Sequence, residues 1–337
     1  MEKLLVKWEY LCASSRLLRF VDINLRGVGQ VMFQNNPLTG ALFLAAIGWG
    51  SYAAGAPRVA IAGLLAVVVA TLTAQWLRVD KESLHAGLSG FNGILVGLAL
   101  ATFLAPSALM WVYVVVGAAV SVVVMLGTVN VVKPWGGALT FPFVLTTWLL
   151  LLATYGFSGL AGAALPTGNV VTAFQPYEGS PLNMVDLARG VLLSISQVFL
   201  KASGVVALIF LVGLAVNSLA AAAFALAGAI LAVLTAHLFG AESDLITGGL
   251  LGFSPVLTAI ALGTVFYQPN WRVAVYTAVA TVFTVIVQAA LNVALTPFAI
   301  PALTAPFVLV TWMFLLPRQC LEPTTTVSAD AATPRAT

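Results

Sequence analysis

The sequence ALTFPFVLTTWLLLL at residues 138–152 returns almost unchanged as ALTAPFVLVTWMFLL at residues 302–316. Two more pairs of segments repeat in the same order. ESLHAGLSGFNGILVGLAL from residue 82 matches ESDLITGGLLGFSPVLTAIALG from residue 242, and RGVGQVMFQNN from residue 26 matches RGVLLSISQVF from residue 189. The offsets are 164, 162 and 167 residues, taken from Thr140 to Thr304, from Phe91 to Phe253 and from Gln30 to Gln197. Three pairs at nearly one offset predict two homologous halves.

The composition places these halves in a membrane. Of 337 residues, 61% are hydrophobic and 7% are charged, whereas a soluble domain carries about 25% charged residues. Mean hydropathy is +1.05. Four long stretches contain no Asp, Glu, Lys or Arg, and each exceeds the roughly 20 residues that one helical span needs. No segment alternates polar and apolar residues as a barrel strand does. The sequence therefore predicts an all-α polytopic membrane protein with almost no charge in its interior. These stretches are residues 83–132, 134–177, 202–241 and 273–317.

The order of apolar segments predicts the topology. About five spans are expected in each half, and an odd number makes the second half enter from the opposite face, as an inverted repeat. The N-terminal segment is charged and amphipathic, which predicts a helix on the membrane surface and a cytoplasmic N-terminus. The predicted first-half spans lie near residues 24–55, 58–78, 83–104, 107–130 and 136–156. The predicted units are residues 1–165, a linking loop at 166–182, residues 183–320, and a disordered tail at 321–337.

Glycines interrupt the second motif in both copies. Gly87, Gly90 and Gly93 lie in the first copy, and Gly248, Gly249 and Gly252 lie in the second. We expect each helix to break near Phe91 or Phe253, giving two half-spanning re-entrant pore helices besides about ten transmembrane helices. The alternative is a continuous helix whose glycines lie at packing contacts.

The third motif resembles the signature of a known family. IPALTAPF at residues 300–307 is similar to the urea transporter signature Leu-Pro-x-x-Thr-x-Pro-Phe, with Ile in place of the first Leu. GGALTFPF at residues 136–143 keeps the Thr, the Pro and the Phe but lacks the leading Leu-Pro. The segment at residues 26–38 and the doubled layout are also similar to that family. The resemblance covers nearly the whole chain apart from the tail.

This resemblance implies a passive urea channel in a cell membrane, a homotrimer with one narrow pore in each protomer. The implied partners are urea and the lipid bilayer, with no nucleic acid, no cofactor, no metal and no enzymatic activity. The pore would hold a flat slot of Phe and Leu side chains and ladders of backbone carbonyls. The slot would be formed by Phe91, Leu95, Phe253 and Leu257. Near its walls would lie Gln30, Val31, Gln197 and Val198, with Phe33 and Leu200 beside them. The centre of the pore would be lined by Thr140 and Thr304.

Elementary chemistry agrees with this function. Urea is planar and neutral, and burying such an amide-like group without partners costs roughly 4–8 kcal/mol. Interrupted helices leave carbonyl groups unpaired, so they can accept hydrogen bonds from the N–H groups of urea. Aromatic faces on either side of a flat solute would exclude hydrated ions. No step requires a charged residue.

Plainer interpretations stay open for single residues. A Phe in a membrane helix usually packs or faces lipid, a Thr often bonds its own i−4 carbonyl, and a Gln often joins helices. Lys201 could reach the interface or a vestibule. The two cysteines, Cys12 and Cys320, match no metal or redox spacing.

Other functions also stay open. An ammonium channel would use paired pore histidines, but His85 and His237 are not at equivalent positions. An ion-coupled small-solute transporter would use an intramembrane carboxylate. A channel for other small amides, ammonia or water is a further alternative. An enzyme would need a buried nucleophile with a base, or a metal cluster, and His237 with Glu242 lacks the usual metal spacing.

Overall fold

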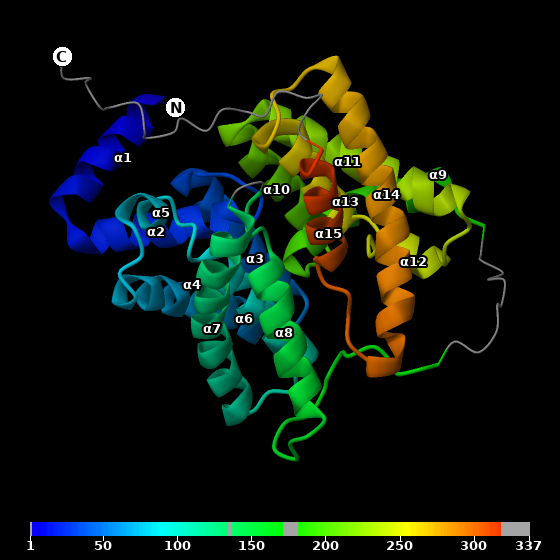
Figure 1. Cartoon of the computed structure of the whole chain (residues 1–337), viewed down its shortest axis with the longest axis horizontal. Coiled ribbons are helices and arrows are strands. Elements are labelled where there is room, and N and C mark those ends of the chain that lie inside the picture. Colours follow the sequence, from blue (N-terminus) through cyan, green and yellow to red (C-terminus); the bar gives the residue numbers. More distant parts are fainter. Residues whose placement is uncertain (1, 134–135, 171–180, 318–337) are drawn as a thin grey trace.

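The computed structural model describes residues 2–133, 136–170 and 181–317, without the side chains of residues 2–5. Within these residues every regular element is a helix, which confirms the predicted all-α class. Figure 1 shows α4, α6, α7 and α8 on one side of the molecule and α11, α13, α14 and α15 on the other. Between them α3 contacts α10, where the Thr39 hydroxyl donates to the Gly213 carbonyl over 2.8 Å.

The elements before residue 160 are α1 (Glu2–Ser14), α2 (Arg16–Gln30), α3 (Pro37–Ala53), α4 (Pro57–Trp76), α5 (Lys81–His85), α6 (Phe91–Phe103), α7 (Ala108–Val132) and α8 (Phe141–Thr154). Those after residue 180 are α9 (Met184–Ser196), η1 (Gln197–Phe199), α10 (Gly204–Asn217), α11 (Leu219–Leu238), α12 (Ser243–Thr247), α13 (Phe253–Ile260), η2 (Ala261–Val265), α14 (Trp271–Leu295), η3 (Thr296–Phe298) and α15 (Ala305–Leu315).

Four helices of the described residues are long and apolar enough to cross a bilayer: α4, α7, α11, and α14 continued through η3. A fifth span results if α9–η1 and α10, which are bent by 72° at a short break, count as one. The apolar helices α6, α8, α13–η2 and α15 are shorter than 18 residues. The predicted total of about ten spans stays a prediction.

The first predicted span is divided into two helices. Residues 24–55 do not form a single helix, because α2 ends at Gln30 and α3 begins at Pro37. Phe33 between them has a left-handed φ of 63°. The Asn36 side chain then accepts hydrogen bonds from the backbone N–H groups of Leu38 and Thr39, which starts the new helix. Pro37, without an N–H, suits the first helical position.

The predicted breaks at Phe91 and Phe253 are confirmed, since α6 and α13 begin at these residues. Gly87 and Gly249 precede them with φ of +74° and +69°. A Cβ on Gly249 would lie 2.3 Å from the Ser194 backbone nitrogen in α9. Only glycine combines this backbone with so close an approach, so the glycines serve both the break and the packing.

The local backbone repeats with the sequence motifs. Positive φ values occur at Phe33 and Leu200, at Arg78 and Gly240, at Gly87 and Gly249, and at Leu139 and Leu303. These pairs have the same offsets as the three sequence motifs. Copies of the motifs therefore fold alike, even where side chains differ.

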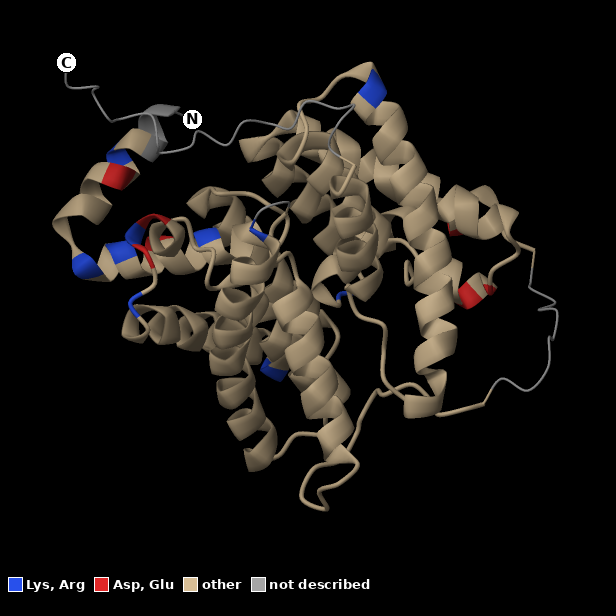
Figure 2. Cartoon of the chain, in the orientation of Figure 1, with Lys and Arg blue, Asp and Glu red and all other residues tan. Residues whose placement is uncertain are grey.

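Charged residues are concentrated away from the helical bundle. Figure 2 shows them on α1, α2 and α5 and near α12, while most of the bundle carries none. This distribution agrees with the predicted apolar interior, apart from two buried charges described below. The predicted tail at 321–337, most of the predicted linking loop and Cys320 lie outside the described residues.

Candidate functional site

The two signature threonines meet at the centre of the molecule. The hydroxyl oxygens of Thr140 and Thr304 lie 2.6 Å apart and share a hydrogen bond. Both side chains are buried, at 2% and 3% exposure. Each threonine directly precedes a helix, α8 or α15, and follows a leucine with a φ near 50°. The left-handed turn before each helix brings the two motif copies together at this point.

Two tryptophans brace this centre in a reciprocal arrangement. The Trp148 indole N–H of α8 donates to the Pro301 carbonyl over 2.9 Å. The Trp312 indole N–H of α15 donates to the Gly137 carbonyl over the same distance. Each motif copy is thus held by the helix of the other. Each carbonyl that they bind lies three residues before the central threonine of its own motif copy.

The two glutamines occupy matching positions. The Gln30 amide donates to the Ala86 carbonyl over 3.0 Å, and the Gln197 amide donates to the Gly248 carbonyl over 3.1 Å. Both carbonyls lie where the short helices α5 and α12 end. The amide nitrogens therefore join helices, as the plainer interpretation held. Within the described residues neither Oε1 atom accepts a hydrogen bond, so each remains available to a solute.

The predicted slot residues fall into two layers. Phe91 and Phe253 are half-buried at the first turn of α6 and α13. Leu95 and Leu257 lie one turn later and are fully buried in the core, at 1% and 0% exposure. Phe33 and Leu200 are half-buried on left-handed turns, whereas Val31 and Val198 are buried. The Phe33 ring lies edge-on to Phe307, with ring centres 6.1 Å apart.

A cavity of about 310 Å³ opens beside the second motif copies. We call it the second-copy cavity. It is lined by five predicted residues, together with Phe103 and Phe143 from α6 and α8. The six predicted residues of the first copies and Leu257 do not line it. The five that do are Gln197, Val198, Leu200, Phe253 and Thr304.

Sequence reasoning missed three polar residues of this cavity. Gln288, Asn292 and Thr296 line it from α14 and its η3 extension. They are spaced by four, so they lie on one face of the helix. Such a polar row in a charge-free segment is a signal that the sequence did contain, because polar groups inside a membrane are costly and usually functional.

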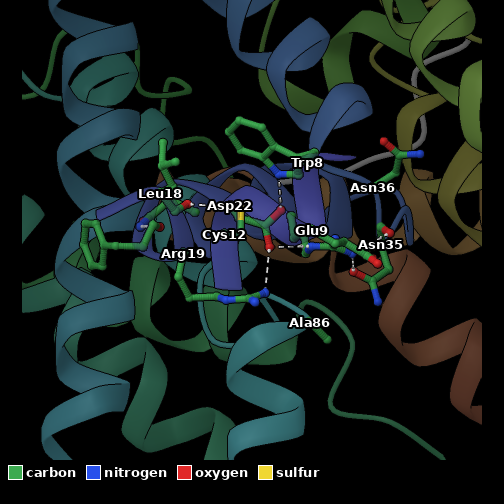
Figure 3. Close-up of polar contacts among 12 residues, drawn as sticks. Trp8, Glu9, Cys12, Leu18, Arg19, Asp22, Asn35, Asn36 and Ala86 are labelled. Carbon is green, nitrogen blue, oxygen red and sulfur yellow. Dashed lines mark hydrogen bonds and ion pairs between the residues drawn. The ribbon is translucent and has the colours of Figure 1, made fainter. Parts of the chain in front are cut away.

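One of the two buried charges lies in α2, within the charged N-terminal segment. The Asp22 side chain is 1% exposed and accepts hydrogen bonds from the Trp8 indole over 2.7 Å and from Arg26 Nε over 2.9 Å. Arg26 also donates to Asn35 Oδ1 over 2.9 Å. Figure 3 shows this cluster, with α1 lying against α2 through it. A buried charge is tolerated here because it is paired and hydrogen-bonded.

Lys201 is the second buried charged residue. Its side chain is 6% exposed and packs against α3 at Gly50. It therefore does not extend to a lipid interface, one of the two positions the sequence left open. In the described part of the chain, no group of three His, Cys, Asp or Glu side chains could hold a metal ion.

Comparison with known proteins agrees with the motifs. The urea transporter family matches residues 21–319. The chain is 28% identical to urea transporter 1 of sheep and of goat over 303 residues, which is 89% of this chain and 77% of each relative. Urea transporter 1 of rat is 28% identical over 310 residues. These relatives belong to a transport family rather than an enzyme family. With this match and its apolar helices, the chain is a multi-pass membrane protein that belongs to the urea transporter family.

Proposed function

We propose that this protein conducts urea passively, down its gradient, through a narrow pore in each protomer. The observation that carries the proposal is the meeting of Thr140 and Thr304, whose hydroxyls share a hydrogen bond of 2.6 Å at a buried point where α8 and α15 begin. A hydroxyl can both donate and accept, so a urea passing between them would replace their mutual bond with one to its carbonyl oxygen.

The flanking residues suit a flat, neutral solute. Phe91 and Phe253 would stack on its faces, while Leu95 and Leu257 support the rings from one turn deeper. The Gln30 and Gln197 Oε1 atoms would accept its N–H groups at either end of the slot. These contacts would offset the roughly 4–8 kcal/mol cost of taking an amide-like group out of water.

We further propose the arrangement around this pore. Residues 1–165 and 183–320 would form an inverted repeat with the pore at their interface, as in transporters whose sites lie near the membrane midplane. The repeated left-handed positions and the reciprocal Trp148 and Trp312 bonds support this relation. A homotrimer in the cell membrane follows from family resemblance.

Urea flux into proteoliposomes, measured by stopped-flow light scattering without an ion gradient, tests the function. We expect fast flux that thiourea or dimethylurea reduces. Flux equal to that of empty liposomes would refute urea conduction. Flux that needs a proton or sodium gradient would instead identify a coupled transporter.

A further inference from the structure

We propose that α14 carries a solute-binding wall that makes the two mouths of the pore chemically unequal. The α14 wall is the row Gln288, Asn292 and Thr296, which lines the second-copy cavity. It would bind the carbonyl oxygen of urea or of another small amide before the solute enters the slot. This inference rests on the proposed function and adds residues to its site.

The α14 wall is a connected polar structure that is buried at Gln288 and half-buried at Asn292 and Thr296. Gln288 is 2% exposed, and its Oε1 accepts from the Ser254 hydroxyl over 2.8 Å. Its Nε2 donates to Asn292 Oδ1 over 3.1 Å. The Thr296 hydroxyl donates to the Asn292 backbone carbonyl over 2.7 Å. Each side chain is thereby fixed on the cavity side of the helix.

The hydrogen bonds within the α14 wall leave some of its polar groups unused. Asn292 Oδ1 is used by Gln288, but its Nδ2 amino group makes no hydrogen bond within the described residues, and it has two N–H donors. The Thr296 oxygen keeps acceptor capacity after its own donation. A purely structural role, in which Gln288 supports Ser254, would account for the buried amide of Gln288. It would not account for the amino group of Asn292, which has no hydrogen-bond partner among the described residues.

Other residues of the same cavity supply an acceptor and an aromatic ring. Gln197 and Phe253 line the same cavity, and Gln197 Oε1 is a free acceptor among the described residues. Donors on α14 and an acceptor on Gln197 match a solute that has one carbonyl and several N–H groups. None of the described residues that line this cavity is charged, so they offer an ion no charged partner.

The first copy carries other residues at the equivalent positions. α7 and α14 each contain 25 residues, so aligning their ends places Met125 opposite Gln288, Val129 opposite Asn292 and Lys133 opposite Thr296. Met125 and Val129 have no side-chain N–H or O–H to donate to a carbonyl oxygen, so the amide donors of the α14 wall have no counterpart in this alignment. The two mouths would therefore differ in affinity for the solute, although net flux through a passive pore still follows the gradient.

Two variants test the α14 wall: Asn292→Val, and Gln288→Met with Asn292→Val, which installs the α7 residues. The double variant replaces both partners of the Gln288–Asn292 bond with apolar groups, a change that proteins tolerate better than removing one partner. Val129→Ala on α7 is the matched control. Monodisperse elution in detergent shows which variants fold.

The readout is the urea concentration at half-maximal flux in proteoliposomes. We expect it to rise about three- to tenfold in both variants, the loss of roughly one hydrogen bond, and to stay unchanged in Val129→Ala. An unchanged value in a folded single or double variant, beside normal wild-type flux, would overturn the α14 wall alone. Absence of wild-type flux would overturn the proposed function and this inference with it.

Discussion

At the residue scale, variants of Thr304 and Thr311 distinguish a contact with the solute from ordinary packing. Thr311 on α15 is also fully buried, and its hydroxyl has no hydrogen-bond partner among the described residues. Replacing Thr304 by Val keeps the shape and removes the hydroxyl. We expect Thr304→Val to reduce urea flux roughly tenfold, a loss of about 1.4 kcal/mol, whereas Thr311→Val leaves flux unchanged. Equal flux in both variants would contradict a central role for Thr304.

In the proposed pore, Phe91 and Phe253 would set the width of the slot. Phe91→Ala or Phe253→Ala removes one face of the slot, so selectivity between urea and bulkier analogues should fall. Flux of dimethylurea relative to urea measures this change, with Phe157→Ala in an exposed loop as the control. Wild-type selectivity in both variants would show that these rings do not form the slot.

At the scale of elements, the turn between α12 and α13 approaches α9 closely at Gly249. Gly249 and Gly240 have nearly the same φ, +69° and +67°, but only Gly249 has another backbone within reach of a Cβ. Gly240→Ala therefore costs left-handed strain alone, about 1–2 kcal/mol. Gly249→Ala adds a clash with Ser194. We expect a clearly lower melting temperature for Gly249→Ala in detergent; matching values would mean that the helices shift apart freely.

The docking of α1 on α2 depends on Asp22. Cys12 of α1 is 2% exposed beneath this contact. Burial raises the pKa of its thiol, and the Asp22 carboxylate raises it further, so less of the reactive thiolate is present at neutral pH. Asp22→Ala removes the acceptor of the Trp8 indole and one partner of Arg26, which keeps Asn35 and Glu9. Maleimide labelling of Cys12 should then become severalfold faster.

Glu9 provides the control for this variant. It lies 3.7 Å from Arg26 but is 62% exposed, and exposed pairs contribute little. Glu9→Gln should label at the wild-type rate. Slow labelling of Asp22→Ala would show that α1 is held by its apolar contacts instead. Both variants carry Cys320→Ser, so that Cys12 is the remaining thiol.

At the scale of the whole molecule, the inverted repeat makes a directional prediction. Gln75 and His237 lie at equivalent positions near the ends of α4 and α11, and both are exposed. An inverted repeat places them on opposite faces of the membrane. Single cysteines at these positions, in a chain without Cys12 and Cys320, should react with an impermeant maleimide from opposite sides. Labelling from the same side would refute the inversion.

The sequence by itself determined the class, the motif copies and the breaks. Long uncharged apolar stretches can only be buried as helices in lipid, and the glycines before Phe91 and Phe253 end helices because of their own backbone freedom. These are local properties, so they can be read from neighbouring residues. The break between Gln30 and Pro37 also has a local signal, the sequence Asn-Asn-Pro that ends at Pro37. The apolar residues on both sides of it instead favour one continuous helix, which is why the predicted span crosses the break.

Only the tertiary structure decided which of these residues meet. The sequence gives no distance between Thr140 and Thr304, because their contact depends on how helices far apart in the chain pack. The buried pair of Asp22 and Arg26 was unexpected for the same reason: burial of a charge is favourable only where Trp8 and Asn35 happen to supply hydrogen bonds. The α14 wall likewise depends on the packing of α13 against α14, which places Gln288 against both the second-copy cavity and Ser254 of α13.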